Sequence, residues 1–184
     1  MTLMVKRVAL ALSLLSVFLS TACGSSTPQA APKVQGQVVS CASIAHNPAI
    51  TKGTSVPCID GGVGQILESV KGPVVLNVWG SWCAPCMQEI PHFVDLAQTK
   101  KVAIVGVDVE EPNMKVGRAF ILSHGMTWPV LFDPDGRTKA LYGIGVPVTW
   151  FINAHGVVIY RHVGIITSDA ILYSEVKKYL GISI

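Results

Sequence analysis

The feature that most constrains the fold is a pair of cysteines between a strand-like run and a helix-like run. Residues 74–79 form a short, mostly apolar and β-branched run bounded by Gly-Pro and Gly-Ser dipeptides, which predicts a buried strand. The sequence Trp-Cys-Ala-Pro-Cys follows at 82–86, and residues 87–98 carry apolar side chains at helical spacing. Cys83 and Cys86 are therefore expected where a strand passes into a helix, as in an α/β protein.

This placement has a chemical consequence for the two thiols. The first turn of a helix stabilises anions, so we expect Cys83 to have a stabilised thiolate, with Cys86 one turn deeper and more buried. Cys83 would then attack a sulfur of the substrate, and Cys86 would attack the resulting mixed disulfide to release the product. Haem attachment is excluded, because Met87 stands where that motif requires a histidine.

Several segments resemble the exported thioredoxin-like proteins of the TlpA/ResA/CcmG type. They are residues 75–86 with Glu89 and Pro91 after them, 102–109, 128–133, 145–152 and 156–160. The resemblance covers about residues 56–182. It implies a thioredoxin fold, an α/β architecture with a central mixed β-sheet flanked by helices, here with an N-terminal extension.

The resemblance also assigns a place to Pro147. A proline within an apolar, strand-like run could simply mark an edge strand or a bulge. The family instead implies a cis peptide bond between Val146 and Pro147, beside the cysteine pair. The backbone groups of Val146 would then be free to bind an extended substrate segment, and Trp82 would form a partly exposed flank of the site.

Glu89 is the candidate acid of the site. It follows Cys86 by three residues and so shares its helical face, although a solvated helix acid is the alternative. The resemblance implies an active-site acid that disfavours the thiolate and exchanges protons with Cys86. Asn77 is a departure from general thioredoxins, which have a buried acid there, and this makes Glu89 the expected substitute. Three further acids are expected to be ordinary loop residues: Asp108, Glu110 and Glu111.

The N-terminus has the pattern of an export signal. A Lys-Arg pair precedes the apolar residues 8–19, a stretch that is short for a bilayer span, and small residues follow at 20–22. Residues 19–26 resemble the lipobox of bacterial lipoproteins, in which Cys23 would become the lipidated first residue, although the leucine lies four rather than three residues before it. The alternatives are ordinary cleavage after Ala22 and an uncleaved anchor helix.

These features divide the chain into three parts. We expect a signal peptide at 1–22, a flexible tether rich in Ser, Thr, Pro, Gln and Gly at 23–40, and a thioredoxin-like domain at 41–184. Removal of the signal lowers the formal net charge from +3 to +1, because the signal holds two basic residues and no acid. A nearly neutral domain without a basic run does not favour nucleic acid as a partner.

The cysteine count supports the same division. The chain has 5 cysteines, an odd number, and a lipid on Cys23 leaves two pairs. We expect Cys41 and Cys58 to form a structural disulfide that staples the N-terminal segment, with a four-cysteine zinc site as the alternative.

The sequence therefore predicts an extracytoplasmic thiol:disulfide oxidoreductase, anchored to the outer face of the cytoplasmic membrane. The resemblance implies a monomeric reductase without cofactor or metal, which a membrane electron-transfer protein recharges. Its substrates would be exported proteins with a disulfide or dithiol, such as apocytochrome c. Two alternatives stay open: a DsbA-like oxidant, and a copper-delivery lipoprotein that uses Cys83, Cys86 and a nearby Met or His.

Overall fold

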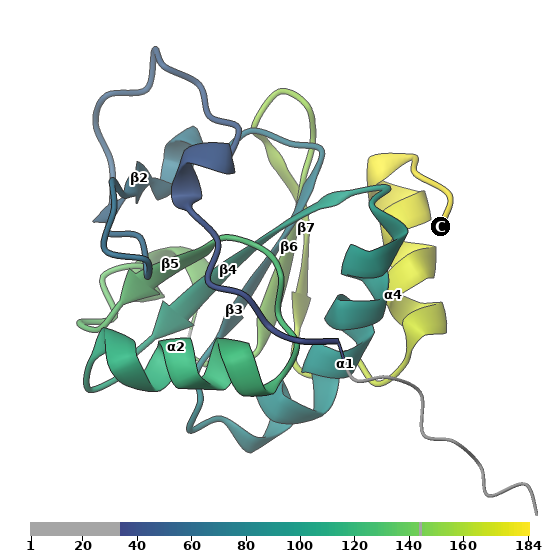
Figure 1. Ribbon diagram of the computed structural model, residues 1–184. Coiled ribbons are helices and arrows are strands. Elements are labelled where there is room, and N and C mark those ends of the chain that lie inside the picture. The colour runs from purple at the N-terminus through teal and green to yellow at the C-terminus, as the bar shows by residue number, and fades with distance from the viewer. Residues whose placement is uncertain (1–33, 144) are drawn as a thin grey trace, which may run out of the picture. The chain divides into compact units, whose positions relative to one another are not determined.

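A computed structural model describes residues 34–143 and 145–184 of the protein (Figure 1). The predicted signal peptide, the lipidation site Cys23 and the tether up to residue 33 lie outside the described residues. The described part has a mixed β-sheet flanked by helices, which confirms the predicted thioredoxin fold.

Strands and helices alternate through the middle of the chain. The strands are β1 (Ser55–Val56), β2 (Gln65–Ile66), β3 (Val74–Trp79), β4 (Ala103–Val109), β5 (Val130–Asp133), β6 (Val148–Ile152) and β7 (Val158–Val163). The α-helices are α1 (Ala84–Thr99), α2 (Met114–Ser123), α3 (Lys139–Tyr142) and α4 (Asp169–Glu175). Two 3-10 helices, η1 (Cys41–Ser43) and η2 (Leu67–Ser69), precede β3, and a π-helical segment, η3 (Val176–Leu180), continues α4. Within the described ranges, no helix combines the length and the apolar composition needed to cross a bilayer.

The central sheet has the strand order β5-β4-β3-β6-β7. Strands β3, β4 and β5 run parallel, whereas β6 is antiparallel to both β3 and β7. All six residues of β3 are buried, as expected for a central strand with both faces covered. Because β3 and β6 are antiparallel, the carboxyl end of β3 lies beside the start of β6, at one end of the strands.

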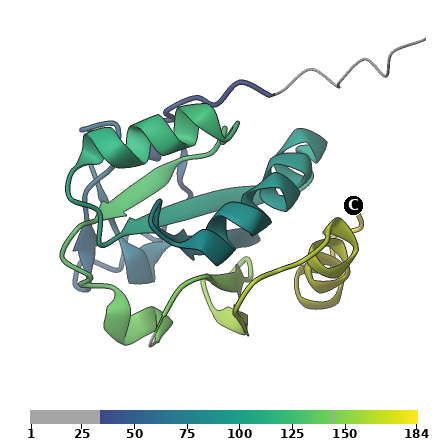
Figure 2. The same ribbon diagram turned by 90° about the horizontal axis from the view of Figure 1, so that it is seen from below.

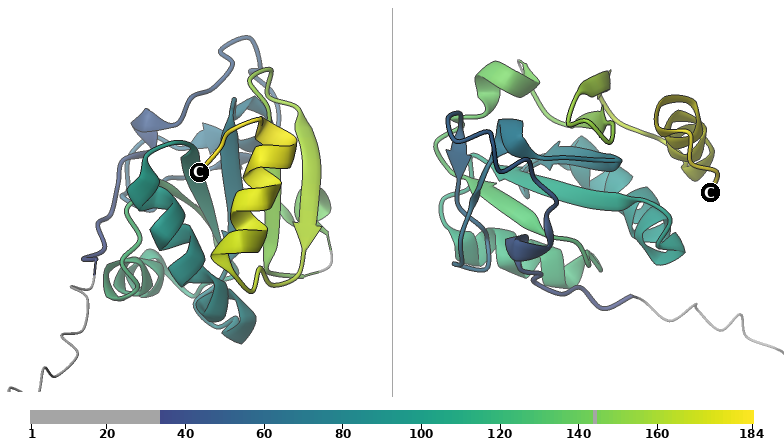
Figure 3. Two further views of the ribbon diagram at one scale, coloured as in Figure 1. Left: turned by 90° about the vertical axis from the view of Figure 1, so that its right-hand side faces the viewer. Right: turned by 90° about the horizontal axis from the view of Figure 1, so that it is seen from above.

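Different parts of the chain cover the two faces of the sheet. Val75 and Trp79 of β3 pack with residues of α1, α2 and α4. Figure 2 shows α1 and α2 on the same side of the sheet, and the left view of Figure 3 shows α1 beside α4. Leu76 and Val78 point to the opposite face, because side chains alternate along a strand, and pack with the N-terminal extension.

Helix α1 begins at Ala84, three residues before the apolar spacing that predicted it. Cys83 is its N-cap residue, since its Sγ accepts a hydrogen bond from the backbone N–H of Cys86. Pro85 occupies the first turn, where the missing N–H costs no helical hydrogen bond. The cap rather than the apolar pattern thus determines where this helix starts.

The N-terminal extension is joined to the edge of the sheet at β5. A disulfide links Cys41 and Cys58, which confirms the predicted pairing, and both residues are fully buried. Residues 57–59 lie along β5: the N–H of Ile59 donates to the carbonyl of Val130 at 3.0 Å. Upstream of the disulfide, residues 37–39 also contact the chain next to β5, where Val39 forms a bridge with Pro129.

Candidate active site

The turn between β3 and α1 holds the Cys83–Cys86 disulfide, with the two Cα atoms 5.3 Å apart. Cys83 is 4% exposed, whereas Cys86 is fully buried. The backbone N–H of Cys86 donates to Cys83 Sγ at 3.2 Å. The first turn of α1 thus directs a hydrogen-bond donor at Cys83 Sγ, and it would stabilise a thiolate there after reduction.

Pro147 lies at the same edge of the sheet as the cysteine pair. The peptide bond between Val146 and Pro147 is cis, as the resemblance implies. Val148 pairs with Val78 near the end of β3, so the register places Pro147 beside the turn that carries the cysteines. Val146, Pro147 and residues at the end of β7 line a small, mainly apolar cavity of about 360 Å³.

Trp82 forms an exposed flank of this region. Trp82 is 53% exposed, whereas Trp79 is fully buried in the core. The indole Nε1 of Trp82 donates to the carbonyl of Val109 at 3.1 Å. This hydrogen bond ties the ring to the end of β4, so its apolar face stays presented to solvent beside Cys83.

Glu89 is buried beneath the cysteines and does not lie on the solvent face of α1. Its Oε1 accepts a hydrogen bond from Asn77 Nδ2 at 2.8 Å, and its Oε2 accepts one from the N–H of Ile166 at 3.0 Å. Burial raises the pKa of Glu89 to about 7, although these hydrogen bonds and the nearby His162 and His92 oppose the shift. A carboxyl of this kind can gain or lose a proton near neutral pH.

Two histidine–carboxylate pairs connect α4 to its neighbours α1 and β7. His92 Nδ1 lies 2.7 Å from Asp169 Oδ1, which links α1 to α4. His162 Nδ1 lies 2.8 Å from Glu175 Oε1, which links β7 to the end of α4. Their spacing in the sequence contains no motif, so only the tertiary structure reveals that both histidines lie near enough to Glu89 to act on its pKa.

Of the three acids that were expected to be loop residues, Asp108 contradicts the prediction, whereas Glu111 does lie in the loop after β4 but is buried there. Asp108 lies within β4 and is fully buried, and Glu111 is only 3% exposed. The Oε1 atom of Glu111 accepts a hydrogen bond from the backbone N–H of Ser81, two residues before Cys83. Only Glu110 is a surface acid, and it pairs with Lys139 at 3.2 Å.

A strand pattern could have identified Asp108 as buried. Ile104, Gly106 and Asp108 alternate with valines on the other face of β4, and both faces of a central parallel strand are buried. No comparable signal exists for Glu111, because its burial depends on contact with the turn after β3.

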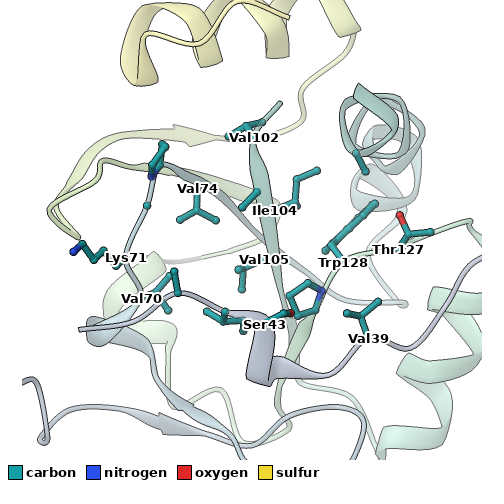
Figure 4. Close-up of a pocket in the computed structure, with 17 residues that line it drawn as sticks. Val39, Ser43, Val70, Lys71, Val74, Val102, Ile104, Val105, Thr127 and Trp128 are labelled. Atoms are coloured by element: carbon teal, nitrogen blue, oxygen red, sulfur yellow. The ribbon is translucent and has the colours of Figure 1, made fainter. Parts of the chain in front are cut away.

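Another cavity lies away from these residues. It measures about 490 Å³ and is lined by residues at the starts of β3 and β4, including Val74 and Ala103 (Figure 4). Cys83, by contrast, follows the end of β3, so the cavity is at the opposite end of the strand. The Cys41–Cys58 disulfide is likewise outside the region of Cys83, at the β5 edge.

Comparison with known proteins gives the same picture as the geometry. The chain is 35% identical over 102 residues to the thiol-disulfide oxidoreductase ResA of Halalkalibacterium halodurans, covering 53% of this chain and 57% of that protein. It is 36% identical over 110 residues to ResA of Bacillus subtilis, covering 57% and 61% respectively. The chain thus spans about three fifths of the length of these two relatives.

Solved structures show the same fold. The structure of MTB DsbF in its mixed oxidised and reduced forms aligns with a TM-score of 0.60 at 26% sequence identity, covering 68% of this chain and 94% of that one. The model of the AhpC/TSA family matches residues 54–161, which include β3, the cysteine pair and the cis-proline. With the family match, the ResA relatives and the thioredoxin-like sheet in agreement, the chain belongs to the AhpC/TSA family.

Proposed function

We propose that this chain is an extracytoplasmic thiol:disulfide oxidoreductase that reduces disulfides of exported client proteins through Cys83 and Cys86. The observation that carries the proposal is the position of Cys83 as the N-cap of α1, disulfide-bonded to Cys86 and at the same sheet edge as the cis-proline Pro147. Two relatives with 35% and 36% identity are named thiol-disulfide oxidoreductases, which supports the same activity.

The first step would be attack by the Cys83 thiolate on a sulfur of the client disulfide. A Cys83–client mixed disulfide forms, the client S–S bond breaks, and the released client sulfur takes up a proton. The helix N-terminus supports this step, because the Cys86 N–H at 3.2 Å stabilises negative charge on Cys83 Sγ.

The second step would be attack by Cys86 on Cys83 Sγ, which releases the second client sulfur and leaves the Cys83–Cys86 disulfide. The dithiol has then lost two electrons to the client. Glu89 can accept the proton of Cys86, since it lies one helical turn further on and burial raises its pKa to about 7. A membrane electron-transfer protein would return the two electrons and restore the dithiol.

The client would bind at the surface formed by Trp82, Val146 and Pro147. Trp82 is half-exposed and offers an apolar face, and the cavity beside Pro147 can take an apolar side chain. No backbone hydrogen bond of Val146 is found among the described residues. Its N–H and C=O groups can therefore pair with an extended client segment. Apocytochrome c is one candidate client.

We further propose that residues 1–22 are removed and that a lipid on Cys23 anchors the protein to the outer face of the cytoplasmic membrane. The residues following Cys23 would serve as a tether, and the anchored protein would be a monomer. The Lys-Arg pair, the apolar stretch and the lipobox-like residues 19–26 support this assignment. Mass spectrometry of protein extracted from membranes tests it, since a mature chain that begins with an unmodified residue would contradict lipidation.

The activity has a direct test in trapping of the mixed disulfide. The Cys86→Ser variant should accumulate a covalent complex with a disulfide-containing protein such as insulin, and a reducing agent should dissolve the complex. The matched Cys83→Ser variant should form none, because Cys86 is fully buried. Equal trapping by both variants, or by neither, would contradict the assigned roles.

The copper-delivery alternative has a separate test. In residues 34–143 and 145–184, no three His, Cys, Asp or Glu side chains are grouped so as to hold a metal ion. Titration of the reduced protein and of Cys83→Ser with Cu(I) distinguishes the two functions. Tight stoichiometric binding without any disulfide exchange would overturn the oxidoreductase proposal.

A further inference from the structure

The loop between β4 and α2 is joined to the active-site turn by two hydrogen bonds. Glu111 Oε1 accepts the N–H of Ser81, and the carbonyl of Val109 accepts the indole N–H of Trp82 at 3.1 Å. Both contacts fall on the two residues directly before Cys83. Glu111 is 3% exposed and Ser81 is half-buried, so the contact is partly shielded from solvent and from screening by salt.

A second carboxyl, Asp108, lies close to this contact. It is fully buried, and neither of its side-chain oxygens has a hydrogen-bond partner in the described structure. Trp79 lies beside it in the register of β3 and β4. On its other side α2 approaches so closely that a Cβ on Gly117 would overlap Asp108 Oδ2. An ionised carboxylate without partners would be costly in this position.

We propose that Glu111 is a positioning residue for Cys83: its carboxylate holds the backbone of Ser81, two residues before the nucleophile, and places a negative charge near it. This inference rests on the proposed function, in which Cys83 is the attacking thiol. The assigned role differs from that of Glu89, which lies behind Cys86 and contacts Asn77 and Ile166 instead.

Asp108 is the uncharged member of this pair of carboxyl groups. Two neighbouring carboxyls in a buried region resist being ionised together. Burial first, and then the charge of Glu111, raise the pKa of Asp108 to about 9, so Asp108 keeps its proton at neutral pH. Asp108 therefore contributes no negative charge to the pair at neutral pH.

Two acids approach the cysteine pair from different elements. Glu111 contacts Ser81 from the β4–α2 loop, and Glu89 lies one turn after Cys86 on α1, where His92 and His162 act on it. The segments 145–147 and 163–167 at this edge of the sheet contain no charged residue. Because Glu111 opposes the effect of the helix N-terminus, it should make the Cys83 thiolate less stable and the dithiol a stronger reductant.

The test compares Glu111→Gln with the matched control Glu110→Gln. Glutamine at 111 can still accept the Ser81 N–H but carries no charge, whereas Glu110 is an exposed acid one residue away that pairs with Lys139. Thiolate absorbance of Cys83 is titrated in a Cys86→Ser background. We expect Glu111→Gln to lower the midpoint by about 0.5 to 1 pH unit, and Glu110→Gln to change it by less than about 0.2.

The same variants with both cysteines present should differ in their equilibrium with glutathione. Loss of the Glu111 charge should favour the dithiol by about threefold to tenfold, because a more stable thiolate stabilises the reduced form. An unchanged midpoint and equilibrium in Glu111→Gln would overturn the proposal. These measurements do not require a client, so they can fail while mixed-disulfide trapping succeeds, and the reverse.

Asp108→Asn identifies which acid carries the charge. Asparagine is close in shape to a neutral aspartic acid, so we expect the Cys83 midpoint to stay within about 0.2 pH unit of the parent protein. A fall as large as that in Glu111→Gln would place the charge on Asp108 and overturn the assignment.

Discussion

At the residue scale, the buried acid of the site comes from a helix and not from the central strand. Position 77 on β3 holds a neutral asparagine, whose Nδ2 donates to Glu89 Oε1 at 2.8 Å. The ionisable group therefore comes from α1, one turn after Cys86, although it occupies the same buried layer between sheet and helix.

The raised pKa of Glu89 predicts a dependence of stability on pH. Between its ordinary pKa of 4.5 and about 7, the folded state keeps a proton that the unfolded chain has lost. The free energy of unfolding should therefore fall as pH rises through this window, by up to about 3 kcal/mol from this group. Glu89→Gln has no such proton, so its stability relative to the parent should increase by about 2 to 3 kcal/mol from pH 4.5 to pH 8.

Urea unfolding of the oxidised proteins at the two pH values measures this change. Asp95→Asn is the matched control, because Asp95 is an exposed acid on the same helix. Its stability relative to the parent should stay constant within about 0.5 kcal/mol. A constant difference for Glu89→Gln as well would show that Glu89 titrates normally.

At the element scale, α2 is placed by its contact with β4. Asn113 caps the helix by accepting from Lys115 and Val116, and Phe120 stacks on Trp79 with ring centroids 4.8 Å apart. The close approach at Gly117 brings the helix backbone onto the buried Asp108. This packing fixes the loop between β4 and α2, and with it the position of Glu111.

Gly117→Ala should therefore destabilise the protein, although alanine normally favours a helix interior by about 1 kcal/mol over glycine. The added methyl group overlaps Asp108 Oδ2 and approaches Ile59, so we expect a loss of about 1 to 3 kcal/mol in the free energy of unfolding. Urea unfolding measures it, with the exposed Lys115→Ala of the same helix as the control. A more stable Gly117→Ala protein would contradict the close packing.

Much of the fold could be predicted from the sequence, because its signals are local. The β-branched run of β3 and the cysteine spacing each depend on neighbouring residues, and the structure has both of them. The burial of Glu111 and the hydrogen bond from Ile166 to Glu89 depend instead on contacts across 30 and 77 residues. No pattern in a single sequence records such contacts, so these two contacts near the thiols could not be predicted.

At the scale of the whole molecule, the two disulfides occupy different environments. Cys83–Cys86 closes a short turn at the end of β3, whereas Cys41–Cys58 spans 17 residues and is buried at the β5 edge. The second bridge fixes residues 57–59 along β5, which covers an edge strand that would otherwise be open to other chains. This arrangement leaves only the first bridge suited to exchange with a client.

Replacement of both Cys41 and Cys58 by alanine should lower stability without removing activity. For a loop of 17 residues, the chain-entropy model gives a loss of about 3 kcal/mol in the free energy of unfolding. Trapping of mixed disulfides through Cys83 should continue in this background at a temperature where the variant is folded. Loss of trapping by the folded variant would show that the bridge takes part in the reaction.

The reduction potential of the Cys83–Cys86 pair tests the central claim most directly. It is measured by equilibration of the protein, in a Cys41→Ala/Cys58→Ala background, with dithiothreitol or glutathione buffers. A reductase of exported clients should have a potential near that of thioredoxin, about −270 mV. A value near that of DsbA, about −120 mV, would contradict the account and assign the protein to the oxidants.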